Sequence, residues 1–269
     1  MQKPLRKVLA EFNYELAPVI KGYNRRTLYI NVGEKAIKSK PVTDLMIDKF
    51  VGGKGFDLFL MWHGVQDDTH WDSPENEICI SFGPLCGNTS YPGSGKSIVT
   101  TISPLTGIPV DCNVGGHFGP YSKFSGWDAI EIQGKADEEV IVYIDGDKGI
   151  VQILSAPDEE INSHILAENL ITEFADDPEK HQFVSVVSSG KGAEHVPISC
   201  LNFSFWDKRR KVARLKQAGR GGTGMVFRDK KIKALVVKYS GLKGDTNNPV
   251  DLETLQKTGL KLHKEIEAG

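Results

Sequence analysis

Residues 83–134 read GPLCGNTSYPGSGKSIVTTISPLTGIPVDCNVGGHFGPYSKFSGWDAIEIQG, and the rest of the chain is organised around this stretch. It is dense in glycine and proline, with short β-branched runs such as SIVTT at residues 97–101. Glycine accepts positive φ angles and leaves backbone N–H groups open to a ligand, and consecutive open N–H groups form nests that bind anions. Residues 218–224, AGRGGTG, have the same character. The two stretches therefore predict a pair of loops that hold one large ligand carrying phosphate.

The composition is that of an ordinary globular protein. The chain has 269 residues, which is enough for one large domain or two small ones. Its net charge is −2. This charge gives no global reason to expect nucleic acid or a membrane surface as a partner. No apolar run approaches the roughly 20 residues of a transmembrane helix, and charges interrupt the apolar part of the N-terminus, unlike a signal peptide. We expect a cytoplasmic protein with no nucleic-acid partner and no transmembrane segment.

The four cysteines, Cys79, Cys86, Cys112 and Cys200, form no CxxC pair. Their spacing matches neither a zinc ribbon nor a ferredoxin-type cluster site, and four cysteines in a chain of this length are not a disulfide framework. The simplest interpretation is a set of buried apolar thiols in a reducing compartment.

The periodicity of the chain predicts an α+β fold. Residues 1–22 form an N-terminal arm whose apolar positions suit a short amphipathic helix: Leu5, Val8, Leu9 and Phe12. In the main body, residues 23–240, β-rich runs predict strands at residues 27–32, 77–82, 129–133, 140–144, 150–154, 183–188, 198–203 and 232–237. Helices are predicted at residues 43–63, with Thr43 as N-cap and a glycine break, and at residues 159–175. Residues 241–269 are predicted to be a linker and the start of a helical segment. Strands outnumber helices and are joined by hairpins, which favours α+β over a doubly wound fold.

Eight short motifs, taken in order, resemble the N-terminal domain of the tungsten-containing aldehyde:ferredoxin oxidoreductase family. The resemblance runs from about residue 22 to residue 237. The motifs lie at residues 51–55, 73–76, 83–85, 103–107, 113–119, 124–130, 134–136 and 218–224. The resemblance implies twin β-sheets that form a base for the cofactor, which is a tungsten (or molybdenum) ion held by two pterin dithiolenes. It also implies a magnesium ion that bridges the phosphates of the two pterins.

The same resemblance implies the cofactor-binding residues. Asn113 and Gln217 match positions whose backbone oxygens help to bind magnesium, which prefers oxygen ligands and retained waters. Lys96 and Lys216 stand where the family usually has arginine, and lysine keeps the charge but loses the bidentate fork. The full set implied for the cofactor is Lys96, Asn113, Gly115, Lys216, Gln217, Gly219 and Arg220.

Other interpretations of these residues stay open from the sequence alone. Lys216 lies in a basic run and suits a solvated surface charge, and Gly115 and Gly219 suit ordinary turns. His117 has the chemistry of an acid/base group, but the resemblance assigns it no role. Residues 93–97, GSGKS, imitate part of a P-loop, which is rejected because Ser90 stands where that motif needs its first glycine.

The resemblance also indicates what other chains must supply. Members of the family are more than twice as long, and their later helical domains carry a [4Fe–4S] cluster and the acid/base residues. We therefore expect this chain to be inactive alone, as a separately encoded subunit or a fragment. Its expected partners are a larger, cluster-bearing subunit and ferredoxin-like electron carriers. The reaction implied is oxidation of an aldehyde to a carboxylate, or the reverse, or reduction of an aromatic thioester. A non-catalytic structural or protein-binding subunit is the alternative, and the two lysines in place of arginine support it.

Overall fold

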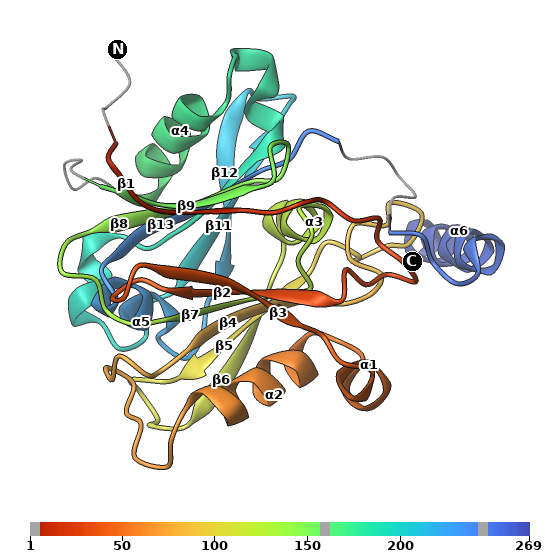
Figure 1. The fold of residues 1–269 in the computed structure, drawn as a ribbon. Helices are drawn as coiled ribbons and strands as arrows, with labels where there is room; N and C mark the ends of the chain where they lie inside the picture. Colours follow the sequence, from red (N-terminus) through yellow and green to blue (C-terminus); the bar gives the residue numbers. More distant parts are fainter. Residues whose placement is uncertain (1–5, 157–161, 242–246) are drawn as a thin grey trace.

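The structure is a computed structural model that describes residues 6–156, 162–241 and 247–269 (Figure 1). It confirms the α+β class: two mixed β-sheets are combined with short helices. The seven-stranded sheet has the order β1-β9-β8-β13-β10-β11-β12. Its strands are β1 Val8–Asn13, β8 Val140–Asp145, β9 Ile150–Ser155, β10 Val184–Ser188, β11 Leu201–Asp207, β12 Val212–Ala218 and β13 Ile232–Lys238.

The six-stranded sheet has the order β3-β2-β7-β4-β5-β6. Its strands are β2 Arg26–Asn31, β3 Ala36–Pro41, β4 Ile78–Phe82, β5 Ser97–Ile102, β6 Pro109–Val114 and β7 Ala129–Gln133. Each sheet contains one parallel pair, β13 with β8 and β2 with β7, and its remaining pairs are antiparallel. The central strands β4 and β13 are mainly apolar and are buried along their whole length. The two lysines of β13, Lys233 and Lys238, are buried as ion pairs with Glu139 and Asp176.

Helices cover both sheets and also fill the space between them. Figure 1 shows α3 (Phe118–Phe124) and α5 (Thr223–Asp229) between the sheets, α4 (Ser163–Phe174) on the outer face of the seven-stranded sheet, and α1 (Asp44–Phe50) and α2 (Lys54–Gly64) on the outer face of the other. The shared core between the sheets includes the aromatic side chains Phe82, Phe118, Phe203 and Phe227. Burial of such large apolar surfaces is the dominant stabilising contribution, so the two sheets are held as one unit by this shared core.

The helix predicted for the N-terminal arm is wrong. Val8–Asn13 form strand β1, which pairs antiparallel with β9 at the edge of the seven-stranded sheet. Leu9 and Phe12 pack against the core between the sheets, and Tyr14 lies against Trp127 with ring centroids 4.8 Å apart. The free edge of β9 offers backbone hydrogen-bond partners that the local apolar pattern does not reveal. Leu5, also assigned to that helix, lies outside the described residues.

The predicted helices of the body are confirmed. The glycine break in residues 43–63 separates α1 from α2, and the Thr43 hydroxyl accepts a hydrogen bond from the Met46 amide as an N-cap. Residues 163–174 form α4, whereas residues 159–161 of the predicted helix lie outside the described part. Near the C-terminus, α6 (Leu252–Ala268) packs through Gly259 against the backbone of Ser90. The predicted linker before it is described only in part, since residues 242–246 lie outside. No helix in the described ranges is long and apolar enough to cross a membrane.

A buried carboxyl group predicts how the stability of this fold depends on pH. Burial raises the pKa of Asp57, on α2, from its ordinary 3.8 to about 8. Native Asp57 then keeps its proton while the unfolded chain releases it, so stability falls as the pH rises from about 4 to about 8. Asp57→Asn is expected to flatten this fall, which is at most about 1.4 kcal/mol per pH unit for one group.

Urea unfolding of the wild type and of Asp57→Asn at pH 5 and pH 8 measures this effect. Burial also raises the pKa of Glu77, to about 7. Part of the loss of stability with rising pH is therefore expected to remain in Asp57→Asn. An unchanged pH dependence in Asp57→Asn contradicts the assignment.

Candidate functional site

Edge strands of the two sheets meet along a seam formed by β6 and β12. A Cβ atom added to Gly115, just after β6, would lie 3.9 Å from Cγ of Lys216 on β12. At the other end of the seam, the Cβ position of Gly221 falls 2.3 Å from Cγ2 of Val110 on β6. The strands β6 and β12 therefore run antiparallel to each other along the seam. The two glycine-rich stretches of the sequence lie side by side here.

Three cationic side chains lie along this seam without acidic partners among the described residues: Lys96, Lys216 and Arg220. Lys96 precedes β5, and its Nζ lies 4.0 Å from the Cβ position of Gly115, so Lys96 and Lys216 flank the same glycine. Nζ of Lys216 lies 5.7 Å from the ring centre of Phe205. Arg220 follows the end of β12. All three side chains are exposed, and an exposed cation with no carboxylate nearby is available to an anionic ligand.

Gly115 and Gly219 are not explained by turn geometry. Neither has a positive φ angle, and the nearest atoms to their Cβ positions are 3.9 Å away. An alanine would therefore fit at either position as the protein stands. The conformationally demanding glycines are their neighbours, with φ of +110° at Gly116 and +70° at Gly222. The sequence-based alternative that Gly115 and Gly219 serve only as turns is not supported by their backbone geometry.

The two predicted magnesium ligands lie on the two facing edge strands. Asn113 is an exposed residue of β6, and Gln217 is an exposed residue of β12. Side chains of successive strand residues point to opposite faces, so the side chain of Gln217 lies on the other face from that of Lys216. Its amide donates a hydrogen bond to Asn202 Oδ1 at 3.4 Å. The geometry therefore leaves the backbone, rather than the Gln217 side chain, as the group that can contribute at the seam.

His117 lines a cavity beside the seam. The cavity has a volume of about 380 Å³ and is bounded by the loops that contain Gly95 and Gly116. Burial lowers the pKa of His117, and the charge of Lys208 lowers it further, so the ring is neutral at pH 7. Its Nδ1 lies 3.2 Å from the hydroxyl of Tyr121. Gln182 and Lys208 also line this cavity, although no motif in the sequence marked them. The only signal was that Lys208 belongs to the basic run at residues 206–217.

The cysteines behave largely as predicted. Cys79, Cys86 and Cys112 are buried, Cys200 is half-buried, and all four thiols are free. Burial raises the pKa of Cys86 to about 12, so its thiol stays protonated at pH 7. No group of three or more histidine, cysteine, aspartate or glutamate side chains among the described residues is arranged to hold a metal ion.

Comparison with known proteins gives matches over most of the chain. The family described as aldehyde ferredoxin oxidoreductase, N-terminal domain, matches residues 27–239. The tungsten-containing aldehyde ferredoxin oxidoreductase of Pyrococcus horikoshii is 32% identical over 252 residues, which cover 92% of this chain and 38% of that protein. The WOR-like subunit of an aliphatic sulfonate oxidoreductase from Pyrococcus furiosus is 26% identical over 234 residues, covering 81% of this chain and 35% of that one.

A solved structure gives a further match. It is the active-site complex BamBC of benzoyl coenzyme A reductase in complex with 1,5-dienoyl-CoA, with a TM-score of 0.76 and 25% identity. The match covers 93% of this chain and 36% of the other. The chain thus spans just over a third of the length of the proteins it resembles.

Proposed function

Because the chain belongs to the aldehyde ferredoxin oxidoreductase family, through its N-terminal domain, we propose that it forms the base for a tungsten (or molybdenum) bis-pterin cofactor in an oxidoreductase. The observation that carries this proposal is the seam between β6 and β12, where Lys96, Lys216 and Arg220 lie without acidic partners among the described residues. Phosphate groups need such cations together with backbone donors.

The seam fits a phosphate-bearing pterin in its charge and in its free space. Gly115 leaves room between Lys96 and Lys216, since its Cβ position is no closer than 3.9 Å to either side chain. An edge strand also presents backbone groups that its own sheet leaves unpaired. We propose that backbone oxygens of Asn113 and Gln217, on the two facing edge strands, help to hold a magnesium ion between the phosphates. Gly219 would let the backbone approach the ligand closely.

The proposed cofactor supplies low-potential redox chemistry when it is bound, and the residues of this chain bind and orient it. The remaining parts are proposed to come from a larger partner chain: the [4Fe–4S] cluster, the acid/base residues and the substrate channel. Electrons would pass to ferredoxin-like carriers. The structural match to a complex, BamBC of benzoyl coenzyme A reductase, supports such a division between chains. In this proposal the chain is inactive alone and acts in a hetero-oligomer that oxidises an aldehyde to a carboxylate or catalyses the reverse reaction.

Reduction of an aromatic thioester is the second candidate. The structural match to a benzoyl coenzyme A reductase complex, with a TM-score of 0.76 over 93% of this chain, favours it. Both reactions would use the same proposed cofactor-binding surface at the seam. They would therefore differ in the substrate channel and not in the seam.

Metal and pterin analysis of the natively purified complex tests the proposal. We expect tungsten or molybdenum by mass spectrometry, in constant ratio to a pterin that fluoresces after oxidation. A complex that contains neither metal and no pterin contradicts the proposal and favours a non-catalytic structural subunit. Assays with an aldehyde and with an aromatic thioester then separate the two reactions.

A further inference from the structure

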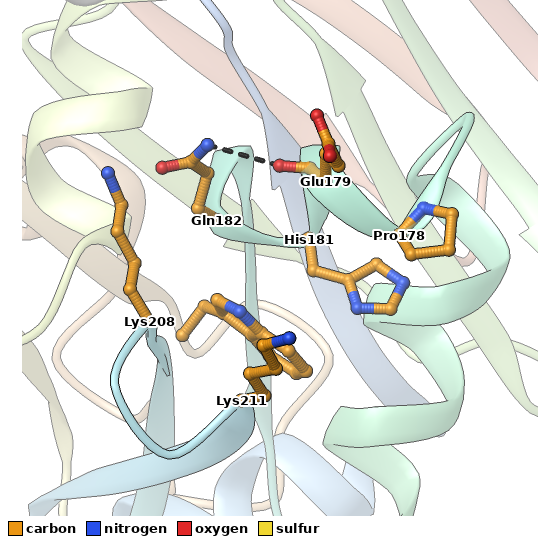
Figure 2. A pocket seen from close by; sticks show the side chains of 7 residues that line it. Pro178, Glu179, His181, Gln182, Lys208 and Lys211 are labelled. Carbon is orange, nitrogen blue, oxygen red and sulfur yellow. Dashed lines mark hydrogen bonds between the residues drawn. The ribbon is translucent and has the colours of Figure 1, made fainter.

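A second cavity, distinct from the seam, lies between η1 (Pro178–Phe183) and the hairpin of β11 and β12. Its volume is about 570 Å³, within the usual range for small-molecule sites. Figure 2 shows lysines from the hairpin on one side and side chains of η1 on the other. The lining residues are Pro178, Glu179, His181, Gln182, Trp206, Lys208 and Lys211.

One wall of the cavity is aromatic. The rings of His181 and Trp206 meet edge to face, with centroids 4.7 Å apart and planes at 79°. Both residues are half-buried. Burial lowers the pKa of His181, so this wall is uncharged at pH 7. An uncharged aromatic wall favours contact with a planar ring.

The hairpin side of the cavity, which also contributes Trp206, carries the positive charges of Lys208 and Lys211. Asp207, the acidic residue nearest to them in the sequence, is already engaged. Its Oδ1 accepts hydrogen bonds from the amides of Arg209 and Arg210, and its Oδ2 lies 2.9 Å from Nη1 of Arg210 and 3.6 Å from Nη1 of Arg214. Neither lysine forms an ion pair with a described residue.

The hairpin turn fixes the backbone that carries the two lysines. The amide of Lys211 donates to the carbonyl of Asp207 at 2.7 Å, and Lys211 has a φ angle of +53°. The turn is thus fixed by Asp207 at both its side chain and its backbone. A fixed turn reduces the conformational entropy lost when the lysines bind a ligand. Two lysines facing one cavity suit an anion with more than one charge.

We propose that this cavity binds a nucleoside diphosphate or a molecule that carries one. The planar base would lie against Trp206 and His181, and the diphosphate would lie between Lys208 and Lys211. Glu179, the acidic lining residue, offers acceptor oxygens for ribose hydroxyls. This site does not depend on the proposed cofactor, because none of its lining residues belongs to the seam. Gln182 and Lys208 also line the cavity beside His117, so the two cavities adjoin and a longer ligand would extend toward the seam.

Calorimetric titration of the natively purified full chain, or of its complex, with ADP tests the proposal. Pyrophosphate and adenosine are the comparison ligands. We expect saturable ADP binding that is weakened about tenfold or more by Lys208→Ala and by Lys211→Ala, because each removes a hydrogen bond to a charged group. Trp206→Ala is expected to weaken ADP binding about three- to tenfold without changing the affinity for pyrophosphate. Trp206→Phe, which keeps an aromatic ring, is expected to preserve most of the affinity and replaces the alanine variant if that one does not fold.

Arg209→Ala is the matched control, since Arg209 is an exposed cation on the same turn that does not line the cavity. It should bind ADP within about twofold of the wild type. Three results would overturn the proposal: no saturable heat with ADP, the same loss in Arg209→Ala as in the lysine variants, or pyrophosphate binding as tight as ADP binding. The last result would indicate an anion site with no role for the aromatic wall. None of these outcomes affects the tungsten and pterin analysis, so the two proposals fail separately.

Discussion

A complex that carries Lys216→Glu is expected to lose most of its tungsten and pterin during purification. Lys216 and Lys96 both lie within about 4 Å of the Cβ position of Gly115 at the seam between β6 and β12. The substitution removes an attraction to phosphate worth about 1.5–3 kcal/mol and adds a repulsion. The combined change is expected to weaken cofactor retention by about a hundredfold or more. Metal content by mass spectrometry and pterin fluorescence after oxidation, both per mole of complex, measure it.

Arg214→Glu is the matched control. Arg214 lies two residues earlier on the same strand and the same face, but it is paired with Asp207 and lies farther from Gly115 along the strand. This control should keep its cofactor, because an exposed ion pair contributes only about 0–1 kcal/mol. Lys216→Arg, which restores the residue type usual in the family, should also keep it. If Lys216→Glu and Arg220→Glu both retain full metal and pterin, the seam does not hold the phosphates and the structural-subunit alternative gains support.

Gly222→Ala is expected to destabilise the fold by about 2–5 kcal/mol. Gly222 has a φ angle of +70°, where a side chain costs roughly 1–2 kcal/mol. Its Cβ would also lie 2.2 Å from the carbonyl oxygen of Pro197 and 2.6 Å from Cγ of Pro104. Overpacking of this kind typically costs a further 1–3 kcal/mol. Urea unfolding measures the loss, and the loop at residues 218–224 is expected to shift with it.

Gly107→Ala separates the two contributions. Gly107 has the same φ angle of +70°, but no atom lies within 4 Å of its Cβ position. Only the conformational cost applies there, so the expected loss is about 1–2 kcal/mol. Equal losses in the two variants would show that the contacts with Pro197 and Pro104 do not constrain the loop.

The eight strands that local sequence predicts are all interior strands, and β5 is the one interior strand among the described residues that it does not predict. Residues 78–82 and 232–238 are mainly apolar, and they form β4 and β13 in the middles of their sheets. The four edge strands, β1, β3, β6 and β12, were not predicted as strands. Each has exposed and polar positions, so its sequence lacks the apolar run that marks a buried strand. The arm at residues 8–13 is the clearest case, because its partner β9 lies about 140 residues away.

The local sequence was enough to predict an α+β fold, the two glycine-rich loops and the cations beside them. These features follow from turn geometry and burial patterns, which depend on residue type over short stretches. It did not predict the seam, because the seam lies between two edge strands, β6 and β12, that belong to different sheets. Their approach depends on the packing of the whole core between the sheets. Strand alternation then decides that the side chains of Lys216 and Gln217 point to opposite faces. The second cavity has the same origin, since the β11–β12 hairpin faces η1 only when both elements are in place on the seven-stranded sheet.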